Sequence, residues 1–487
     1  MKIRSSLIAL ACLGAFGSAQ ALSPVDVAAA RAAGTLKEVR LSGASALRLL
    51  IGSFIQADLA DPTTFDVYFD SATGSNHRAY AFKTKVAIGS WPIGTPVLIT
   101  KRDTGGSAQG VTPLLNGGDA TQTHMLVDNV ASCTATANPS PTNDILKPSF
   151  TCTGTVAALA HAGFSDVEPA LLQATINGGA GLDVSGLDAS GFVQNIFGVA
   201  VNKKLYLALQ KAQGLVPAGA TVIDETAAAQ PSVPKSFFAG ALTGQLLGST
   251  PLKKGWNLLI PASVDSNVLN KTVNVCRRTP GSGTQASSNL YFANNPCGGT
   301  ANQYTPVAGS TTAVPSATGV LSVIQNASSG AVETCLGNVD NVADATGGAY
   351  GFGVLGRENN PQPTVGGVVQ DRGYRYVKLS GVAPGRAAVV SGDYDYVVEA
   401  SMQWPASAAA NAPSAEVLAL LQFMRGQMGR AAILQGLDPD LQAGLAALPS
   451  TVPSGTAWAD LDPVTQSYTS HTNRNAANSC SFVRMTK

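Results

Sequence analysis

The sequence feature that most constrains the fold is the stretch at residues 273–292. It begins with a β-branched run typical of a strand and passes through Arg277 and Arg278. It then turns at a Thr-Pro-Gly-Ser-Gly sequence before residues that favour a helix. The glycines permit a sharp reversal of the backbone between the two elements. The stretch therefore predicts a strand–turn–helix unit, the kind from which α/β sheets are built.

The turn of this unit has the chemistry of an anion-binding site. Ser282 and Thr284 suit a helix N-terminus and carry hydroxyls, and the first backbone N–H groups of a helix attract anions. An arginine directly upstream, Arg277 or Arg278, adds a planar fork that matches an oxyanion. An ordinary strand–turn–helix corner is the alternative, and the arginine pair favours the anion site over it. Because no lysine follows the glycines, the turn is not a nucleotide P-loop.

Similar units are predicted along the rest of the chain. In open α/β sheets, ligands bind where such turns leave the carboxyl ends of strands. The expected elements are a strand at 38–41 with a helix at 47–60, a strand at 65–69 with a helical segment at 78–83, a strand at 96–101 with a Gly-Gly-Ser turn, a doubly buried strand at 195–201, and an amphipathic helix at 416–434.

The N-terminus carries the pattern of a secretory signal peptide. Lys2 and Arg4 precede an apolar run, and Ala19-Gln20-Ala21 matches a cleavage site. No later stretch approaches the roughly 18 apolar residues that cross a bilayer. We therefore expect residues 1–21 to be removed and the mature chain to be periplasmic or secreted, without a transmembrane segment.

Six cysteines remain outside the predicted signal peptide: Cys133, Cys152, Cys276, Cys297, Cys335 and Cys480. An even number in an exported chain suggests three disulfides. Cys133 and Cys152 flank a polar loop and are expected to pair. A Cys276–Cys297 bridge is awkward, because a helix from residue 284 would carry Cys297 away while a disulfide needs Cα atoms within about 7 Å. We favour Cys297–Cys335, which leaves Cys276 and Cys480, but the sequence does not settle the pairing of these four.

Composition and motifs argue against several functions. Only 13% of the residues are charged and the net charge is +1, with no basic stripe, so nucleic-acid binding has no support. The four histidines lie without metal-ligand spacing, and no Gly-x-Ser-x-Gly motif is present. We expect no catalytic residues, no metal site and no cofactor, and we do not expect an enzyme.

The chain resembles the periplasmic phosphate-binding components of ABC uptake systems, a family of class II periplasmic binding proteins. The arginine loop carries the most specific similarity, because it matches a family pattern of Arg, spacer residues and Gly-Ser-Gly-Thr. The stretches that carry the resemblance are Gly43-Ala-Ser-Ala46, Gly74-Ser75, Gly163-Phe-Ser-Asp166, Arg278-Thr-Pro-Gly-Ser-Gly-Thr284 and, late in the chain, Gly381-Val-Ala-Pro384 with Gly392-Asp-Tyr394.

The resemblance implies an α/β fold of two lobes with mainly parallel sheets, an interlobe ligand cleft and inserted disulfide-stapled loops. The first lobe would hold residues 36–193, the second 195–371, and residues 372–487 would return to the first lobe. It also implies which residues bind phosphate: Ser45, the N–H of Ala46, Ser75, Asp166 as acceptor of the phosphate proton, and Arg278, Ser282, Gly283 and Thr284 from the second lobe. Individually, Ser45, Ser75 and Asp166 could instead be helix caps.

Two functions from different classes follow. The first is an exported solute-binding protein that captures phosphate or a similar oxyanion, with an inner-membrane ABC permease as its partner. The second is a surface or extracellular structural or adhesive protein on the same fold, with weak ligand binding or none. The low charge favours the second function, whereas Arg278, Asp166 and the hydroxyl-bearing turns favour the first.

Overall fold

The computed structural model describes residues 22–128, 131–137, 145–179, 181–246, 255–316, 320–342, 348–365, 367–474, 480–481 and 483–486. The predicted signal peptide at residues 1–21 lies outside these ranges. Within them, no helix combines the length and the apolar character needed to span a membrane.

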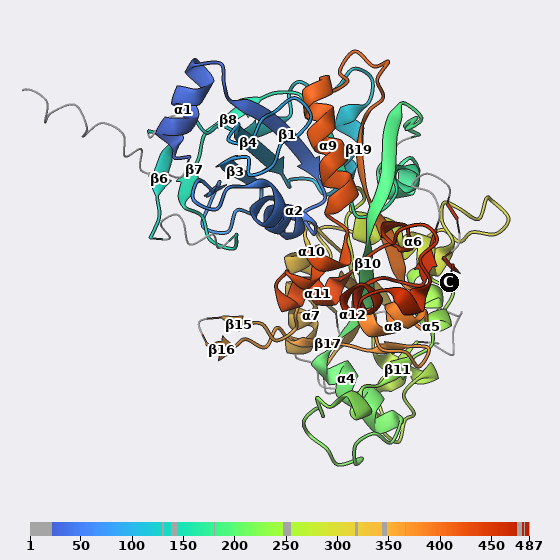
Figure 1. Cartoon of the computed structure of the whole chain (residues 1–487). Coiled ribbons are helices and arrows are strands. Elements are labelled where there is room, and N and C mark those ends of the chain that lie inside the picture. Colours follow the sequence, from blue (N-terminus) through green and yellow to red (C-terminus); the bar gives the residue numbers. More distant parts are fainter. Residues whose placement is uncertain are drawn as a thin grey trace, which may run out of the picture. The chain divides into compact units, whose positions relative to one another are not determined.

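The chain is a mixed α/β protein (Figure 1). Its helices are α1 (Pro24–Ala32), α2 (Arg48–Phe54), α3 (Pro169–Leu172), α4 (Lys203–Ala212), α5 (Lys235–Leu242), α6 (Gly283–Ala293), α7 (Ser329–Asn341), α8 (Arg386–Ser391), α9 (Ala415–Gln427), α10 (Ala431–Gln435), α11 (Pro439–Gly444) and α12 (Pro463–Tyr468). Its main strands are β1 (Lys37–Gly43), β2 (Asp66–Phe69), β3 (His77–Lys83), β4 (Pro96–Arg102), β6 (Cys133–Ala135), β7 (Phe150–Cys152), β9 (Ala162–Ser165), β10 (Leu187–Asn202), β12 (Val273–Arg278), β13 (Leu321–Asn326), β14 (Tyr350–Gly356) and β19 (Val397–Pro405). Short strands are β5 (Thr123–Met125), β8 (Thr155–Ala157), β11 (Ser232–Val233), β15 (Thr364–Val365), β16 (Val368–Val369), β17 (Tyr374–Tyr376), β18 (Lys378–Leu379), β20 (Leu445–Ala446), β21 (Thr472–Asn473) and β22 (Arg484–Met485).

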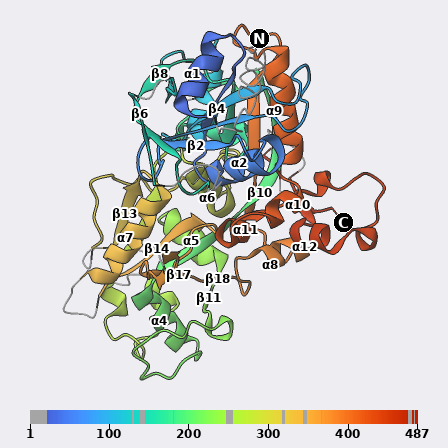
Figure 2. The same cartoon turned by 60° about the vertical axis from the view of Figure 1, so that its left-hand side comes forward.

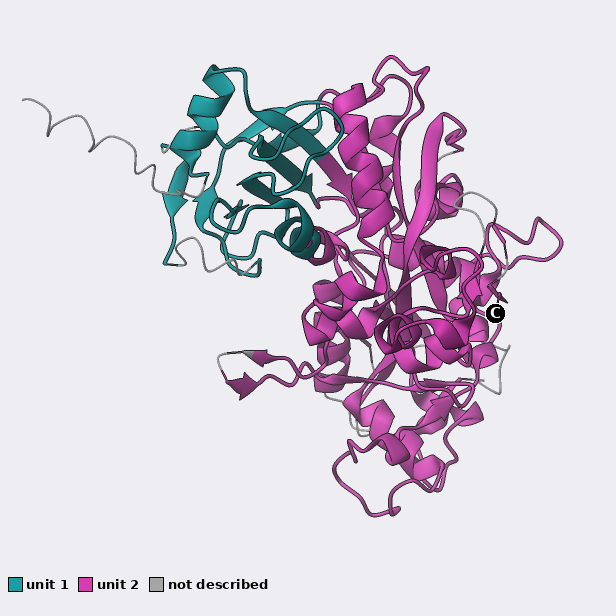
Figure 3. Ribbon diagram, in the orientation of Figure 1, with its two compact units in different colours: residues 1–40, 52–102, 121–158 teal, residues 41–51, 103–120, 159–487 magenta. Residues whose placement is uncertain are grey.

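The chain divides into two compact units, which Figure 3 colours separately. Unit 1 holds residues 1–40, 52–102 and 121–158, and unit 2 holds 41–51, 103–120 and 159–487. The predicted lobe boundaries at 36–193, 195–371 and 372–487 follow a different division and stay a prediction.

Unit 1 is built on a strand order of β4-β3-β2-β7-β6. The segment at 78–83 is a strand rather than the helix expected from the sequence. Strand β3 pairs antiparallel with both β2 and β4, and four of its side chains are apolar and buried. Sheet pairing on both edges thus overrides the local helical preference. The expected Cys133–Cys152 disulfide is confirmed and joins the antiparallel pair β6 and β7.

The sheet of unit 2 has the strand order β13-β12-β14-β10-β19-β9 and ends on the last residues of β1. Strand β12 runs parallel to β13 and β14, and β1 runs parallel to β9. The central strand β10 is 16 residues long and pairs antiparallel with β14 and β19. The expectation of mainly parallel sheets is therefore wrong, because both strands that flank β10 run opposite to it.

The predicted buried strand at 195–201 lies inside β10, where every side chain from Phe192 onward is buried. The amphipathic helix expected at 416–434 is interrupted, since α9 ends at Gln427 and α10 begins at Ala431. Serine side chains accept hydrogen bonds at the N-termini of α6, α7 and α9, as helix caps commonly do.

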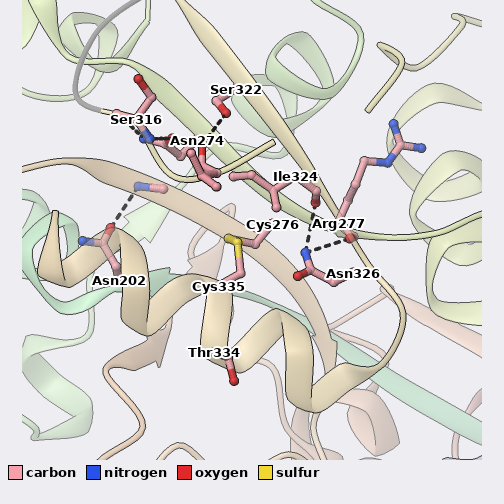
Figure 4. The surroundings of a disulfide bond; sticks show 12 residues. Asn202, Asn274, Cys276, Arg277, Ser316, Ser322, Ile324, Asn326, Thr334 and Cys335 are labelled. Atoms are coloured by element: carbon pink, nitrogen blue, oxygen red, sulfur yellow. Dashed lines mark hydrogen bonds between the residues drawn. A yellow bond between two sulfur atoms is a disulfide. The ribbon is translucent and has the colours of Figure 1, made fainter. Parts of the chain in front are cut away.

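The other two disulfides join Cys276 to Cys335 and Cys297 to Cys480. The favoured Cys297–Cys335 pairing is therefore wrong. Helix α7 follows β13 and packs on β12, β13 and β14 (Figure 2), which places Cys335 over Cys276 with their Cα atoms 5.9 Å apart (Figure 4). Cys297 follows α6 and is reached by the C-terminal segment instead.

Candidate functional site

The carboxyl ends of β1 and β9 lie side by side in unit 2. Gly43 is paired with Phe164, and the N–H of Ala44 donates to the Phe164 carbonyl at 2.8 Å. The turns that follow these strands therefore leave the same edge of the sheet. One turn carries Ser45 and Ala46, both half-buried before α2, and the other carries Asp166.

A third turn, the 3-10 helix at Ser107–Gly110, packs directly on these strand ends. A Cβ atom on Gly43 would lie 2.0 Å from the Phe164 carbonyl oxygen, and one on Gly163 would lie 1.8 Å from the carbonyl oxygen of Gly110. The Gly110 carbonyl also accepts a hydrogen bond from Gln403 Nε2 at 2.6 Å. Such close backbone packing requires glycine at these positions.

The N-terminus of α6 meets the same turns. Ser107 Oγ donates to Asp166 Oδ2 at 3.0 Å and accepts from the Asp166 N–H at 3.1 Å. A Cβ atom on Gly283 would lie 2.5 Å from Ser107 Oγ and 2.6 Å from Asp166 Cβ. Ser282 caps the helix by accepting from the N–H of Gln285. We call Ser107, Asp166, Ser282, Gly283 and Thr284 the α6 cluster, and all five are buried.

Arg278 lies at the end of β12, just before this helix, and its residue is only 7% exposed. Its Nη1 donates to Ser329 Oγ at 3.1 Å and its Nη2 donates to the Ala327 carbonyl at 3.0 Å. Its Nε is buried and has no hydrogen-bond partner among the residues that the structure describes. Burial lowers the pKa of Arg278, while the carboxylates of Asp166 and Glu358 act in the opposite direction. A buried donor without a partner is costly, and either a water molecule or a bound ligand in the adjacent space would satisfy this Nε.

The Arg277 guanidinium has different hydrogen-bond partners from those of Arg278. Its Nε donates to Gln285 Oε1 at 3.0 Å and its Nη1 donates to the Val307 carbonyl at 2.6 Å. Burial lowers the pKa of Arg277 to about 10. Its hydrogen bonds join β12 to α6 and to the segment near Val307, which makes it a structural residue of the unit.

The cavity that Arg278 lines is small. It is also bounded by Thr284, Gln285 and Ser288 of α6, and its volume is about 10 Å³. A space of this size holds about one water molecule. Any larger ligand beside Arg278 therefore requires neighbouring segments to move apart.

The structure thus brings Asp166, Ser282, Gly283 and Thr284 together, with Arg278 entering from β12. Ser45 and Ala46 lie in the turn beside that of Asp166. Ser75 is different, because it is exposed in the loop between β2 and β3 of unit 1 and no helix follows it. Its role in binding stays a prediction.

Sequence reasoning missed Ser107, which holds the Asp166 side chain. The signal was present: a Gly-Gly-Ser sequence directly after the strand at Pro96–Arg102. Gly74-Ser75 is a similar glycine–serine sequence, and it follows β2. The antiparallel pairing of β2 with β3 shows that this loop only connects two neighbouring strands.

No protein-family model matches the chain, and no curated protein sequence matches it. Solved structures that are similar include an ABC-type phosphate transport receptor from Vibrio cholerae, with a TM-score of 0.37, 10% identity, and coverage of 82% of this chain and 100% of that chain. Another is PstS from Borrelia burgdorferi, with a TM-score of 0.32, 10% identity, and coverage of 82% of this chain and 96% of that chain. At such scores and identities the likeness carries no argument about the ligand of this chain.

Proposed function

We propose that the chain binds inorganic phosphate or a similar oxyanion at the α6 cluster and acts as an exported solute-binding protein. The observation that carries the proposal is the meeting of three anion-binding elements in one buried place. These are the guanidinium of Arg278, whose Nε has no partner in the described part of the chain, the N-terminus of α6, and the hydroxyl-bearing turn of Ser107. Together they offer charge, backbone N–H groups and hydroxyls to an oxyanion.

Asp166 gives the proposed site its selectivity. A carboxylate accepts a hydrogen bond but cannot donate one, so it favours an anion that still carries a proton. Phosphate near neutral pH has such a proton, whereas sulfate is fully ionised. Sulfate would leave two negative groups facing each other, which is the repulsive element that specificity requires.

Binding requires the cluster to open, because the cavity beside Arg278 is water-sized. Backbone hydrogen bonds hold the arginine loop to its neighbours, and two of them involve Gly281. The N–H of Ala108 donates to the Gly281 carbonyl at 2.9 Å, and the N–H of Gly281 donates to the Asn177 carbonyl at 2.9 Å. We infer that these bonds break or shift when the anion enters.

Transport is the biological role that we propose for this binding. Residues 1–21 would direct export, and three disulfides fit an oxidising compartment such as the periplasm. The partner would be an inner-membrane ABC permease that receives the released anion.

The direct test is calorimetric titration of the mature protein with phosphate and sulfate at two pH values. We expect phosphate to bind and sulfate to bind at least about tenfold more weakly, which is about 1.4 kcal/mol. Asp166→Asn should reduce this discrimination, because the amide can donate to sulfate. Asp183→Asn is a matched control, since Asp183 is exposed and accepts local hydrogen bonds from Ser185. Absence of binding for both anions would contradict the proposal.

A structural or adhesive role is the second candidate. The observation in its favour is that both arginines of the loop already donate to protein oxygens, while the cavity is only about 10 Å³. In that case the α6 cluster would be a rigid joint of unit 2. The protein would then show no thermal shift with any oxyanion.

A further inference from the structure

The C-terminal part of unit 2 contains a cavity of about 270 Å³. This volume is close to the lower end of the roughly 300–1,000 Å³ found for small-molecule pockets, so the cavity suits one ring-sized molecule. Its described walls come from residues within 449–461 and from Ser470, His471, Asn473 and Thr486. No residue of the α6 cluster is among them.

Hydrogen bonds within the protein hold the walls of this cavity in place. Gln466, in α12, donates from Nε2 to the carbonyls of Trp458 and Leu461, both at 3.0 Å. The N–H of Thr486 donates to the His471 carbonyl at 2.7 Å, which fixes two further lining residues to each other. The cavity is therefore formed without a ligand, as small-molecule sites usually are.

Two aromatic side chains meet at the cavity. The rings of Trp458 and His471 lie against each other, with 3.8 Å between their centres and 39° between their planes. Both residues line the cavity, and both are half-buried. The face of an aromatic ring is electron-rich and attracts weakly positive C–H groups. This pair of rings therefore favours a ligand with a flat C–H face, such as a sugar ring.

The lining carries hydrogen-bonding groups but, among its described residues, no carboxylate, ammonium or guanidinium. Ser450 and Ser454 are exposed and Thr456 is half-buried, and the hydroxyls of these three make no hydrogen bond to another described residue. Asn473 adds an amide. Hydroxyls and amides both donate and accept, which matches the hydroxyls of a neutral sugar. An ionised ligand would lose hydration here without a permanent opposite charge to compensate it.

We propose that this cavity is a binding site for an uncharged sugar of one ring. The rings of Trp458 and His471 contact the C–H face of the sugar, and the serine, threonine and asparagine side chains bond its hydroxyls. The site shares no residue with the α6 cluster, and its ligand carries no charge. The proposal therefore goes beyond oxyanion binding, and the two can fail independently.

The test uses the full mature protein with glucose, galactose and mannose as probes, at about pH 8, where free histidine side chains are uncharged. Ligand-observed NMR should show binding of at least one of the three. The uronate of that sugar, which differs in carrying a carboxylate, should bind at least about tenfold more weakly. Cyclohexanol, a ring of similar size with a single hydroxyl, should also bind more weakly than the sugar.

Tryptophan fluorescence reports where the sugar binds. The chain has four tryptophans, and the three other than Trp458 are at most 2% exposed. A sugar in the cavity should therefore change the emission of Trp458, which is half-buried. Binding without a change in tryptophan emission would place the sugar elsewhere and overturn the proposal.

A double variant, Ser450→Ala with Ser454→Ala, tests the hydrogen bonds without disturbing the fold, because both serines are exposed. It should weaken sugar binding by about fivefold or more. The matched control is Ser263→Ala with Ser266→Ala, two exposed serines of unit 2 outside the cavity lining, and it should leave sugar binding unchanged. Arg278→Ala should also leave it unchanged, which separates this site from the α6 cluster.

Three further results would overturn the proposal. The first is no binding of any of the three sugars at millimolar concentration. The second is binding of the uronate or of cyclohexanol as tight as that of the sugar. The third is unchanged sugar affinity in the variant that lacks the hydroxyls of Ser450 and Ser454.

Discussion

The neighbouring arginines allow binding to be separated from stability. Arg277 is 6% exposed and Arg278 is 7% exposed, and each donates two hydrogen bonds to protein oxygens. Hydrogen bonds to charged groups contribute roughly 1.5–3 kcal/mol each, so each alanine variant should lose up to about 3–6 kcal/mol of unfolding free energy. The actual loss should be smaller, because alanine also removes the cost of burying a charge. The two variants should therefore be destabilised by similar amounts.

Arg277→Ala and Arg278→Ala should differ in their affinity for phosphate. Of these two arginines, only Arg278 has a buried Nε without a hydrogen-bond partner among the described residues, and this Nε is the donor left for the anion. Losing one charge-assisted hydrogen bond of roughly 1.5–3 kcal/mol raises the dissociation constant by about 10- to 150-fold. Arg277→Ala should change it by less than about threefold. Arg278→Lys should recover only part of the loss, because lysine restores the charge but not the planar fork.

Two measurements on the same preparations check this reasoning. Urea unfolding followed by tryptophan fluorescence gives the loss of stability, and calorimetric titration with phosphate at a temperature where all variants are folded gives affinity. Equal and small effects of Arg277→Ala and Arg278→Ala on affinity would refute the binding role of Arg278. The loop would then be a structural corner only.

Three further predictions concern the rest of unit 2. Digestion with trypsin and a glutamate-specific protease without reduction should release peptides linked through Cys276–Cys335 and Cys297–Cys480, and mass spectra showing other links would contradict the structure. Gly283→Ala should cost about 1–3 kcal/mol in urea unfolding because its Cβ would overlap Asp166, whereas Gly219→Ala, with open space around it, should cost far less. Burial raises the pKa of Glu358 from 4.5 to about 7, so the folded state holds this proton more tightly and stability should fall as pH rises between these values. Glu358→Gln should remove this fall in the free energy of unfolding with pH, and an unchanged slope of unfolding free energy against pH would contradict the prediction.

Local sequence signals predicted the elements of the candidate site well. The strand–turn–helix unit at 273–292 carries its own capping serine, and the structure places Ser282 at the N-terminus of α6 as expected. Asp166 follows β9, in a stretch that the family resemblance singled out, and it reaches the cluster because β9 lies beside β1. Short-range pattern and helix capping were sufficient for Ser282, whereas the position of Asp166 depends on the pairing of two strands that are distant in the sequence.

Long-range pairing could not be predicted. Ser75 and Ser107 each follow a strand and a glycine, so their local sequences do not show which of them reaches the α6 cluster. The pairing of β3 with β2 and β4 shows that Ser75 lies in a loop between neighbouring antiparallel strands. The Cys133–Cys152 bridge, with a separation of 19 residues, was predictable from its short loop, whereas Cys297 and Cys480 are 183 residues apart. The antiparallel neighbours of β10 also depend on contacts between distant segments.

The pairing of β9 with β19 has a consequence for the order of folding. Ser165 is paired with Ser401, and β19 is also the partner of β10, so the strand that positions Asp166 gains its antiparallel neighbour only from the last quarter of the chain. Contacts of such long sequence separation form slowly, because a large loop must close before they stabilise anything. A nascent N-terminal portion thus cannot complete the arrangement around Asp166 by itself. We expect this region to acquire its native form late, after synthesis of nearly the whole polypeptide.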